Sequence, residues 1–105
     1  MIDVVALGEL LIDFAAKSAD AAGYPTMAAN PGGAPGNFLA ALNAYGRKTA
    51  FLGKVGNDAF GHLLLGTLNA AGIVTKGIVV DDSVFTTLAF VTFDESGDRS
   101  FSFAR

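Results

Sequence analysis

The sequence contains no cysteine and only one histidine, His62, which excludes several kinds of site at the outset. Disulfide bonds and thiolate metal sites need cysteine, and a metal site built from several histidines needs more than one. We therefore expect no metal site in this chain, and we predict that His62 is an exposed helix residue. The absence of cysteine is compatible with a cytoplasmic location, which is the default expectation.

Charged residues are also few, at 16% of the chain against 51% hydrophobic residues, with a net charge of -3. Disordered chains show the opposite balance, so this chain is expected to fold and to bury further surface against something else. Of the seven lysines and arginines only Arg47 and Lys48 are adjacent, so we expect no nucleic-acid partner. No uncharged apolar run reaches about 18 residues, and we expect no membrane partner either.

The hydrophobic pattern predicts strands that alternate with helices. Buried strands are expected at Val4–Gly8, Thr49–Val55 and Ile78–Val80. One helix is expected to begin near Pro35 and to stop at Gly46. A second helix, capped by Asn57 or Asp58, is expected to end at Gly72. We interpret Asp58 as a structural cap for this reason.

The last part of the sequence has a different pattern. Thr86–Phe93 is rich in β-forming residues and a polar turn follows at 94–98. Arg99–Arg105 then alternates strictly, with Phe101 and Phe103 pointing one way and Ser100 and Ser102 the other. This pattern predicts an antiparallel hairpin with one face in water. Between the first strand and the first helix, the segment 17–31 is expected to be loop-like, with a short edge strand at Met27–Ala29.

A glycine-rich turn, GGAPGN, occupies residues 32–37 in front of the first helix. Its backbone N–H groups and the helix N-terminus are expected to point toward one spot, and Asn37 can both donate and accept hydrogen bonds. A plain loop before a helix explains the same letters equally well. Two phosphate-binding motifs are excluded, because no Gly-Lys-Ser/Thr occurs and Gly8 is followed by Glu-Leu-Leu rather than by a dinucleotide fingerprint.

Asp13 lies among apolar residues just after the first strand. Open α/β sheets place their ligands at the carboxyl ends of strands, and a buried aspartate needs hydrogen-bond donors. Sugar hydroxyls would serve as donors, and backbone N–H groups in a turn would serve as well.

Three pieces, GELLIDF, GGAPGNFLAALNAYG and FLGKVGNDAFG, together resemble the N-terminal signature of the ribokinase-like (PfkB) carbohydrate kinase family. The segment TTLAFVTFDESGDRSFSFAR that follows is similar to the fructokinase and 2-keto-3-deoxygluconate kinase branch. The resemblance implies the N-terminal part of a three-layer α/β/α sandwich with a small β lid. Residues 1–85 would belong to the α/β kinase domain, with lid strand material within 14–31, and residues 86–105 would form a lid hairpin.

The resemblance also implies a sugar site. In this family an aspartate after the first strand and the signature glycines and asparagine contact the sugar, and lid aromatics and an arginine contribute in the fructokinase-like branch. The residues at these positions are Asp13, Gly32, Gly33, Asn37, Phe90, Phe103 and Arg105. Ala104 departs from the aromatic residue that often precedes this arginine.

The activity implied by the resemblance is ATP- and Mg²⁺-dependent phosphorylation of a sugar hydroxyl, with fructose as the first choice. The family's catalytic aspartate stands in a Gly-rich motif that this sequence does not contain, so we expect no catalytic residue and no ATP site here and predict that the 105 residues alone are inactive. Ribose, 2-keto-3-deoxygluconate and a nucleoside remain alternative substrates. A non-catalytic sugar-binding module remains an alternative of another class. We also expect a homodimer, formed through the lid or an exposed sheet edge.

Overall fold

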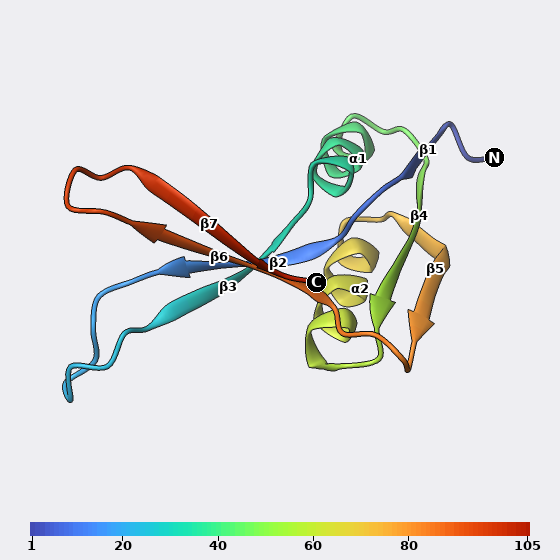
Figure 1. The fold of residues 1–105 in the computed structure, drawn as a ribbon. Helices are drawn as coiled ribbons and strands as arrows, with labels where there is room; N and C mark the ends of the chain where they lie inside the picture. Colours follow the sequence, from blue (N-terminus) through green and yellow to red (C-terminus); the bar gives the residue numbers. More distant parts are fainter.

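The computed structural model describes all residues from 1 to 105 and contains two separate β-sheets (Figure 1). The first sheet is parallel, with the strand order β1-β4-β5. Its strands are β1 (Val4–Leu7), β4 (Thr49–Gly56) and β5 (Val74–Asp81). The three buried strands expected from the sequence are confirmed, and the third is longer than its apolar run indicated.

Two helices connect these strands, α1 (Ala34–Ala44) and α2 (Ala59–Ala70). Proline in the first turn starts α1, and Gly46 and Gly72 follow the two helix ends with φ angles of +86° and +82°. Such left-handed positions are adopted by glycine without the steric cost that a side chain brings. Asp58 caps α2, since its Oδ1 accepts a hydrogen bond from the Gly61 N–H at 2.7 Å. Both helices are as the sequence predicts.

The helices cover only one face of the first sheet. Each connects neighbouring parallel strands in the same direction across the sheet, and right-handed crossovers then place both helices on the same side. The opposite face carries apolar side chains that remain exposed, namely Val5, Leu7, Leu52 and Val79. The chain therefore builds two packed layers, and the outer face of its sheet is apolar.

The hydrophobic core lies between the helices and the first sheet. It consists of nine buried residues, Leu10, Ile12, Leu39, Phe51, Val55, Leu64, Leu68, Ile73 and Ile78. Each of these side chains contributes about 1.5–3 kcal/mol when it is removed from water. Two of them, Leu10 and Ile12, come from the segment that leaves the first sheet, so the core also fixes the start of the second sheet.

The second sheet extends away from this core, to the left in Figure 1. Its strand order is β3-β2-β6-β7, with β2 parallel to β6 and the other pairs antiparallel. The strands are β2 (Leu11–Ala16), β3 (Met27–Gly32), β6 (Thr87–Phe93) and β7 (Arg99–Ala104). The expected hairpin is present as β6 and β7, and the expected edge strand at Met27–Ala29 continues to Gly32.

The prediction of a hairpin with one wet face is wrong for β7. Every residue of β7 is exposed, and Phe101 and Phe103 keep 53% and 50% of their surface accessible. Strict alternation indicates that two faces differ in chemistry, but burial requires a covering layer, and no part of this chain covers the Phe101 and Phe103 face. The aromatic face of the hairpin is therefore a surface.

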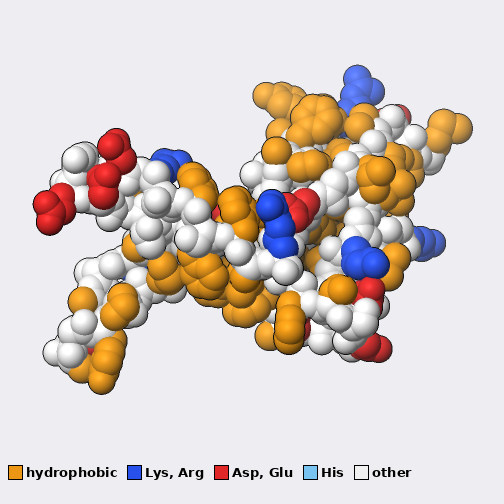
Figure 2. Space-filling view, viewed as in Figure 1, with side chains coloured by type: hydrophobic (Ala, Val, Ile, Leu, Met, Phe, Trp, Pro, Cys, Tyr) orange, Lys and Arg blue, Asp and Glu red, His pale blue; other side chains and the backbone are white.

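The molecule is elongated, with extents of 51 × 33 × 22 Å and a radius of gyration of 15.4 Å. A compact domain of about 100 residues has a radius of gyration of about 13 Å. Figure 2 shows hydrophobic side chains at the junction of the two sheets and over the part of the surface around β1 and β4. No helix is long and apolar enough to cross a membrane.

Candidate sugar site

Asp13 and Gly32 lie next to each other on neighbouring strands, β2 and β3. A Cβ atom at Gly32 would collide with the Asp13 carboxylate and would stand 3.1 Å from Cδ1 of Leu11. The absence of a side chain at Gly32 therefore makes room for this carboxylate. Sequence reasoning selected both residues, and the structure brings them together.

The Asp13 carboxylate has no partner within the chain. The two ion pairs join Lys54 to Asp81 and Arg105 to Glu9, and no side-chain hydrogen bond involves Asp13. The residue is nevertheless half-buried. A partly buried carboxylate gains stability when donors reach it, so this group is free to accept hydrogen bonds from a ligand.

Gly33 forms the sharp turn between β3 and α1. Its φ angle is +110°, and a Cβ atom here would lie 2.5 Å from the backbone oxygen of Glu9. Only glycine tolerates this combination of conformation and close backbone approach. The turn thus presses the start of α1 against the segment between β1 and β2.

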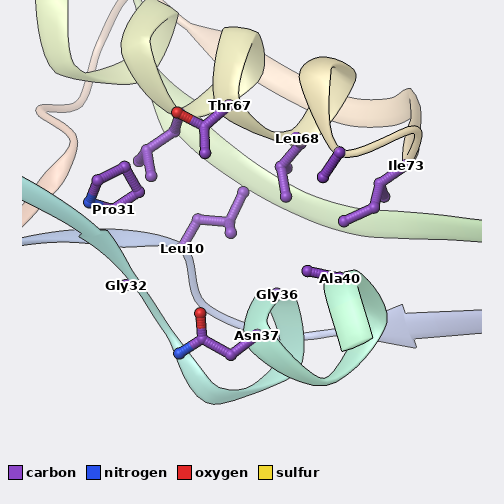
Figure 3. A pocket seen from close by; sticks show the side chains of 11 residues that line it. Leu10, Pro31, Gly32, Gly36, Asn37, Ala40, Thr67, Leu68 and Ile73 are labelled. Carbon is purple, nitrogen blue, oxygen red and sulfur yellow. The ribbon is translucent and has the colours of Figure 1, made fainter. Parts of the chain in front are cut away.

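Asn37 is exposed in the first turn of α1, where its backbone N–H donates to the Gly33 carbonyl at 3.2 Å. Figure 3 shows its side chain extending from the helix start toward the strand that carries Gly32, away from Leu68 and Ile73. The side-chain amide makes no hydrogen bond within the chain. Asn37 therefore lies beside the glycine turn with free donor and acceptor groups.

Sheet register places Phe103 on the same face as Asp13. Asp13 pairs with Ala89 on β6, and Ala89 pairs with Phe103 on β7, and directly paired residues share a face. Strands in a sheet lie about 4.8 Å apart, so the two backbones are separated by about 10 Å across the sheet. This span suits a small ring-shaped ligand that is held at one side by a carboxylate and at the other by an aromatic ring.

Phe90 is not brought together with these residues. It pairs with Phe14, so it occupies the opposite face of the second sheet, where the two rings stack with centroids 5.4 Å apart. Phe60 of α2 meets Phe14 edge-on at 5.3 Å on that face. The structure gives Phe90 a packing environment and separates it from Asp13.

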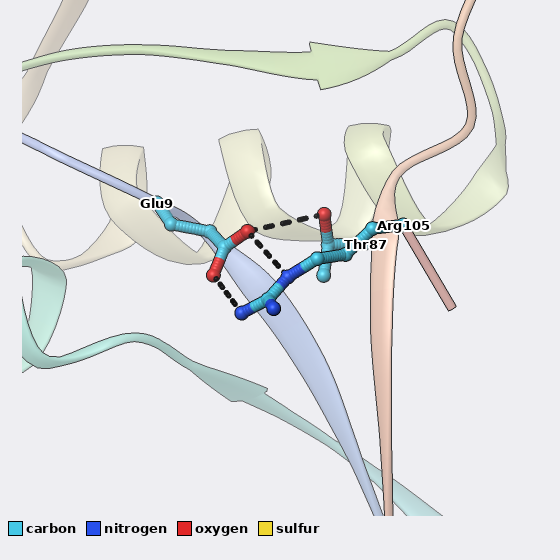
Figure 4. Close-up of polar contacts among 3 residues, drawn as sticks. All are labelled: Glu9, Thr87 and Arg105. Atoms are coloured by element: carbon cyan, nitrogen blue, oxygen red, sulfur yellow. Dashed lines mark hydrogen bonds and ion pairs between the residues drawn. The ribbon is translucent and has the colours of Figure 1, made fainter. Parts of the chain in front are cut away.

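Arg105 follows β7, and its guanidinium is held by the Glu9 carboxylate (Figure 4). Its Nη2 and Nε donate to the two carboxylate oxygens of Glu9, at 3.1 and 3.3 Å. The Cζ atom lies 4.3 Å from the centroid of the Phe103 ring, which is a cation–π distance. The Thr87 hydroxyl reaches the same Glu9 carboxylate at 3.5 Å, and the pairing of Thr87 with Leu11 puts this cluster on the Asp13 face.

A small cavity lies behind the glycine turn, between α1 and α2 (Figure 3). Its volume is about 100 Å³, and its walls include Leu10, Ala40, Leu68 and Ile73. Sites for small organic ligands usually measure about 300–1,000 Å³ and combine apolar walls with convergent polar groups. This cavity is smaller, and only Asn37 and Thr67 add polar side chains to its lining, so we do not assign the sugar to it.

A larger hollow of about 490 Å³ lies on the other face of the second sheet. Its lining includes Phe60, Phe85, Leu88, Ala104 and Arg105. Its three polar lining residues have partners within the chain: Asp58 and Thr86 are hydrogen-bonded to each other, and Arg105 is paired with Glu9. The unpartnered polar groups lie on the Asp13 face instead.

Asp58 and Thr86 fasten α2 to the connection between the two sheets. The Asp58 carboxylate accepts hydrogen bonds from the Thr86 N–H at 2.9 Å and from its hydroxyl at 2.7 Å, while Gly56 N–H donates to the same hydroxyl at 3.0 Å. Partial burial opposes the charged form, but the N–H donors of Thr86 and Gly61 and the Thr86 hydroxyl outweigh it, so the pKa of Asp58 is lowered. The cap expected at Asp58 is confirmed, and His62 is exposed as expected.

Sequence reasoning missed Glu9. Its only signal in the sequence is an acidic residue directly after Gly8, at the end of the first strand. Its partner Arg105 is 96 residues away in the chain, and such a pairing follows from register in three strands that a single sequence does not reveal.

The structure combines a parallel βαβαβ unit, a small sheet that projects from it, and a carboxylate beside a glycine turn, which are the features that the sequence resemblance to ribokinase-like proteins implied. The pfkB carbohydrate kinase family model matches residues 1–105. The chain belongs to this family.

Known relatives agree with this assignment. The chain is 43% identical to fructokinase-2 of Solanum lycopersicum over 104 residues, which is 97% of this chain and 32% of that protein. It matches the structure of fructokinase from Xylella fastidiosa with a TM-score of 0.90 and 39% identity, over 97% of this chain and 32% of the other. The same fructokinase with bound ATP matches with a TM-score of 0.89. The chain thus spans about a third of the length of these relatives.

Proposed function

We propose that this chain supplies much of the sugar site of an ATP-dependent carbohydrate kinase, and that the sugar is fructose. The observation that carries the proposal is the Asp13 carboxylate, which is half-buried, unpartnered and fitted against the bare backbone of Gly32. Family membership over all 105 residues supports the reaction class. The names of the similar proteins, fructokinases of plants and of Xylella fastidiosa, support the choice of sugar.

Each residue of the site has a distinct part in this proposal. Asp13 accepts hydrogen bonds from two neighbouring sugar hydroxyls, and Gly32 and Gly33 let the sugar approach the backbone. Asn37 donates to or accepts from a third oxygen, since an amide offers both kinds of group. Phe103 packs against the apolar side of the ring, and Arg105 contacts an oxygen at its far end.

These contacts prepare the sugar for phosphoryl transfer by binding and orientation. Holding an acceptor hydroxyl in one geometry lowers the entropic part of the barrier, and phosphoryl transfer depends largely on positioning and charge stabilisation. ATP, used with Mg²⁺, would supply the phosphoryl group. We assign neither the base nor the ATP-binding residues to this chain, and we leave Phe90 out of the site because it packs on Phe14.

The test is a kinase assay on the enzyme that contains this chain. ADP formation is measured with ATP, Mg²⁺ and a panel of fructose, 2-keto-3-deoxygluconate, ribose and adenosine. The proposal predicts the highest kcat/KM for fructose. A higher value for another acceptor would overturn the choice of sugar, and calorimetric binding of sugar without any ADP formation would show a binding module instead of a kinase.

A further inference from the structure

Glu9 connects the two halves of the candidate site. Its backbone oxygen lies where a side chain on Gly33 would be, and its carboxylate holds the guanidinium of Arg105. We propose that Glu9 is a positioning residue that orients Arg105 and compensates its charge, so that the site prefers uncharged sugars to sugar acids. This inference rests on the proposed function and concerns how the same site selects its substrate.

The contact fixes one edge of the guanidinium. Nε and Nη2 donate to Oε2 and Oε1 of Glu9, while Cζ lies over the Phe103 ring, 4.3 Å from its centroid. Two hydrogen bonds to one edge of a planar guanidinium, together with an aromatic ring close to its Cζ atom, restrict its orientation. Its Nη1 group takes no part in the ion pair and remains available as a donor to a sugar oxygen.

The stability of the fold does not explain this pair. The Arg105 and Glu9 side chains are 58% and 45% exposed, and exposed ion pairs contribute little to folding. What the pair does determine is where the charge of Arg105 points and how much of that charge a ligand encounters. Its effect is therefore expected in binding and specificity.

The charges of the site favour a neutral ligand. Asp13 and Glu9 are carboxylates and Arg105 is the only cation among the site residues, so the sum over these three groups is negative. A free arginine would bind a carboxylate ligand by two parallel hydrogen bonds, but Glu9 already occupies the Nε–Nη2 edge that makes such a pair. A sugar acid would meet uncompensated negative charge, whereas a polyol would find donors and acceptors.

The experiment compares fructose with 2-keto-3-deoxygluconate in the enzyme that contains this chain. Glu9→Gln keeps the size of the side chain and removes its charge, and we expect the kcat/KM ratio of sugar acid to fructose to rise about tenfold. Glu95→Gln, in the exposed turn at the far end of the hairpin, makes the same change of charge and should leave the ratio unaltered. An unchanged ratio in Glu9→Gln, or an equal rise in Glu95→Gln, would overturn the proposal.

A second variant tests whether Glu9 acts through Arg105. Glu9→Gln should raise the KM for fructose in the normal background but not in the Arg105→Met background, where no guanidinium is left to orient. Additive effects of the two changes on this KM would contradict a positioning role. If Glu9→Gln fails to fold, Arg105→Met provides the test by itself. It should lower the kcat/KM ratio of sugar acid to fructose, and an unchanged ratio would count against the inference.

The failure of this inference is distinguishable from the failure of the proposed function. If the unaltered enzyme phosphorylates neither sugar, the proposed function is wrong. If it prefers fructose to the acid but Glu9→Gln leaves the kcat/KM ratio of the two unchanged, the proposed function stands and the role given to Glu9 is wrong.

Discussion

At the scale of single residues, the candidate site depends on glycines, which have no side chain, as much as on its polar side chains. Gly32 leaves the space that the Asp13 carboxylate occupies, and Gly33 lets the backbone of Glu9 come within contact distance. Both contacts join segments that are distant in sequence. A glycine-rich turn that looks like an ordinary loop in the sequence therefore determines where the only unpartnered, half-buried carboxylate of the second sheet is held.

Gly32→Ala tests this use of empty space. The new methyl group displaces the Asp13 carboxylate, so we expect the KM for the sugar to rise about tenfold or more, with a small change in stability because only the end of a side chain must move. Gly66→Ala is the matched control, since nothing lies within 4 Å of a Cβ at this α2 position. It should raise stability by about 0.5–1 kcal/mol and leave sugar kinetics unchanged. Equal kinetic effects of the two changes would contradict the account.

Asp58 gives a prediction about stability and pH. In Asp58→Asn, the amide N–H₂ would face an N–H group that now donates to the carboxylate. We therefore expect the free energy of unfolding to fall by about 1–2 kcal/mol at neutral pH. The folded-state pKa of Asp58 is below its ordinary value of 3.8. Its contribution is therefore complete above that value and is lost as the pH falls through the lower folded-state pKa.

Urea unfolding at neutral pH and at about pH 3 checks this prediction. The difference in stability between the unaltered protein and Asp58→Asn should shrink in acid. Asp98→Asn, in the exposed hairpin turn, serves as the control and should change little at either pH. A constant difference across the two conditions would show that the charge of Asp58 is irrelevant to the fold.

At the scale of elements, the sequence predicted the strands and helices well and the sheets incompletely. The starts and stops of α1 and α2 follow from Pro35, Asp58 and the two glycines after the helices, which act locally. The end of β1 was predicted to within one residue, at Gly8, but nothing in the apolar residues after Glu9 showed that another strand begins at Leu11. Pairing between distant strands has no local signal, and the partners of Glu9 and Phe90 depended on it.

The residues of the candidate site could be proposed from the sequence, but their arrangement could not. Asp13, Gly32 and Asn37 were identified from motif order, and the structure places all three around one turn. The faces of the second sheet were not predictable, because a face follows from register: Phe103 shares a side with Asp13, whereas Phe90 stacks on Phe14 behind it. Resemblance between sequences identifies positions, and the arrangement of strands decides which of them meet.

The second sheet should move as a unit relative to the first. Its contacts with the core are made near its base, by Ile12, by Phe14 against Phe60 and by the hydrogen bonds between Asp58 and Thr86, while every residue of β7 is exposed. Elements with few buried contacts open more readily than the core. Hydrogen exchange should therefore be faster in β6 and β7 than in β4, and saturating sugar should slow it in the enzyme that contains this chain. Protection in β7 equal to that in β4 without sugar would rule out a mobile sheet.

At the scale of the whole molecule, exposed apolar surface is the dominant feature. Leu7, Tyr45 and Phe85 keep 78%, 86% and 89% of their surface accessible, and the outer face of the first sheet has no covering layer. Large exposed apolar patches favour association. The 105-residue chain expressed by itself should therefore be marginally stable or associated, as sedimentation would show. A monomer with a steep, cooperative unfolding transition would contradict this expectation.

For the whole molecule we propose that this chain binds the sugar and that residues outside it bind ATP. Asp13 is expected to contribute most to sugar binding, because a charged hydrogen-bond acceptor contributes more free energy than the neutral amide of Asn37.

The most direct measurement is the steady-state kinetics of Asp13→Ala, Asp13→Asn and Asn37→Ala in the enzyme that contains this chain, with Asp98→Ala as the control. We predict that Asp13→Ala lowers kcat/KM for fructose about a hundredfold, that Asp13→Asn recovers part of this loss, and that Asn37→Ala costs less. The KM for ATP should stay the same in all variants. If Asp13→Ala instead lowers the melting temperature and leaves sugar kinetics intact, Asp13 is a structural residue and the proposed sugar site is wrong.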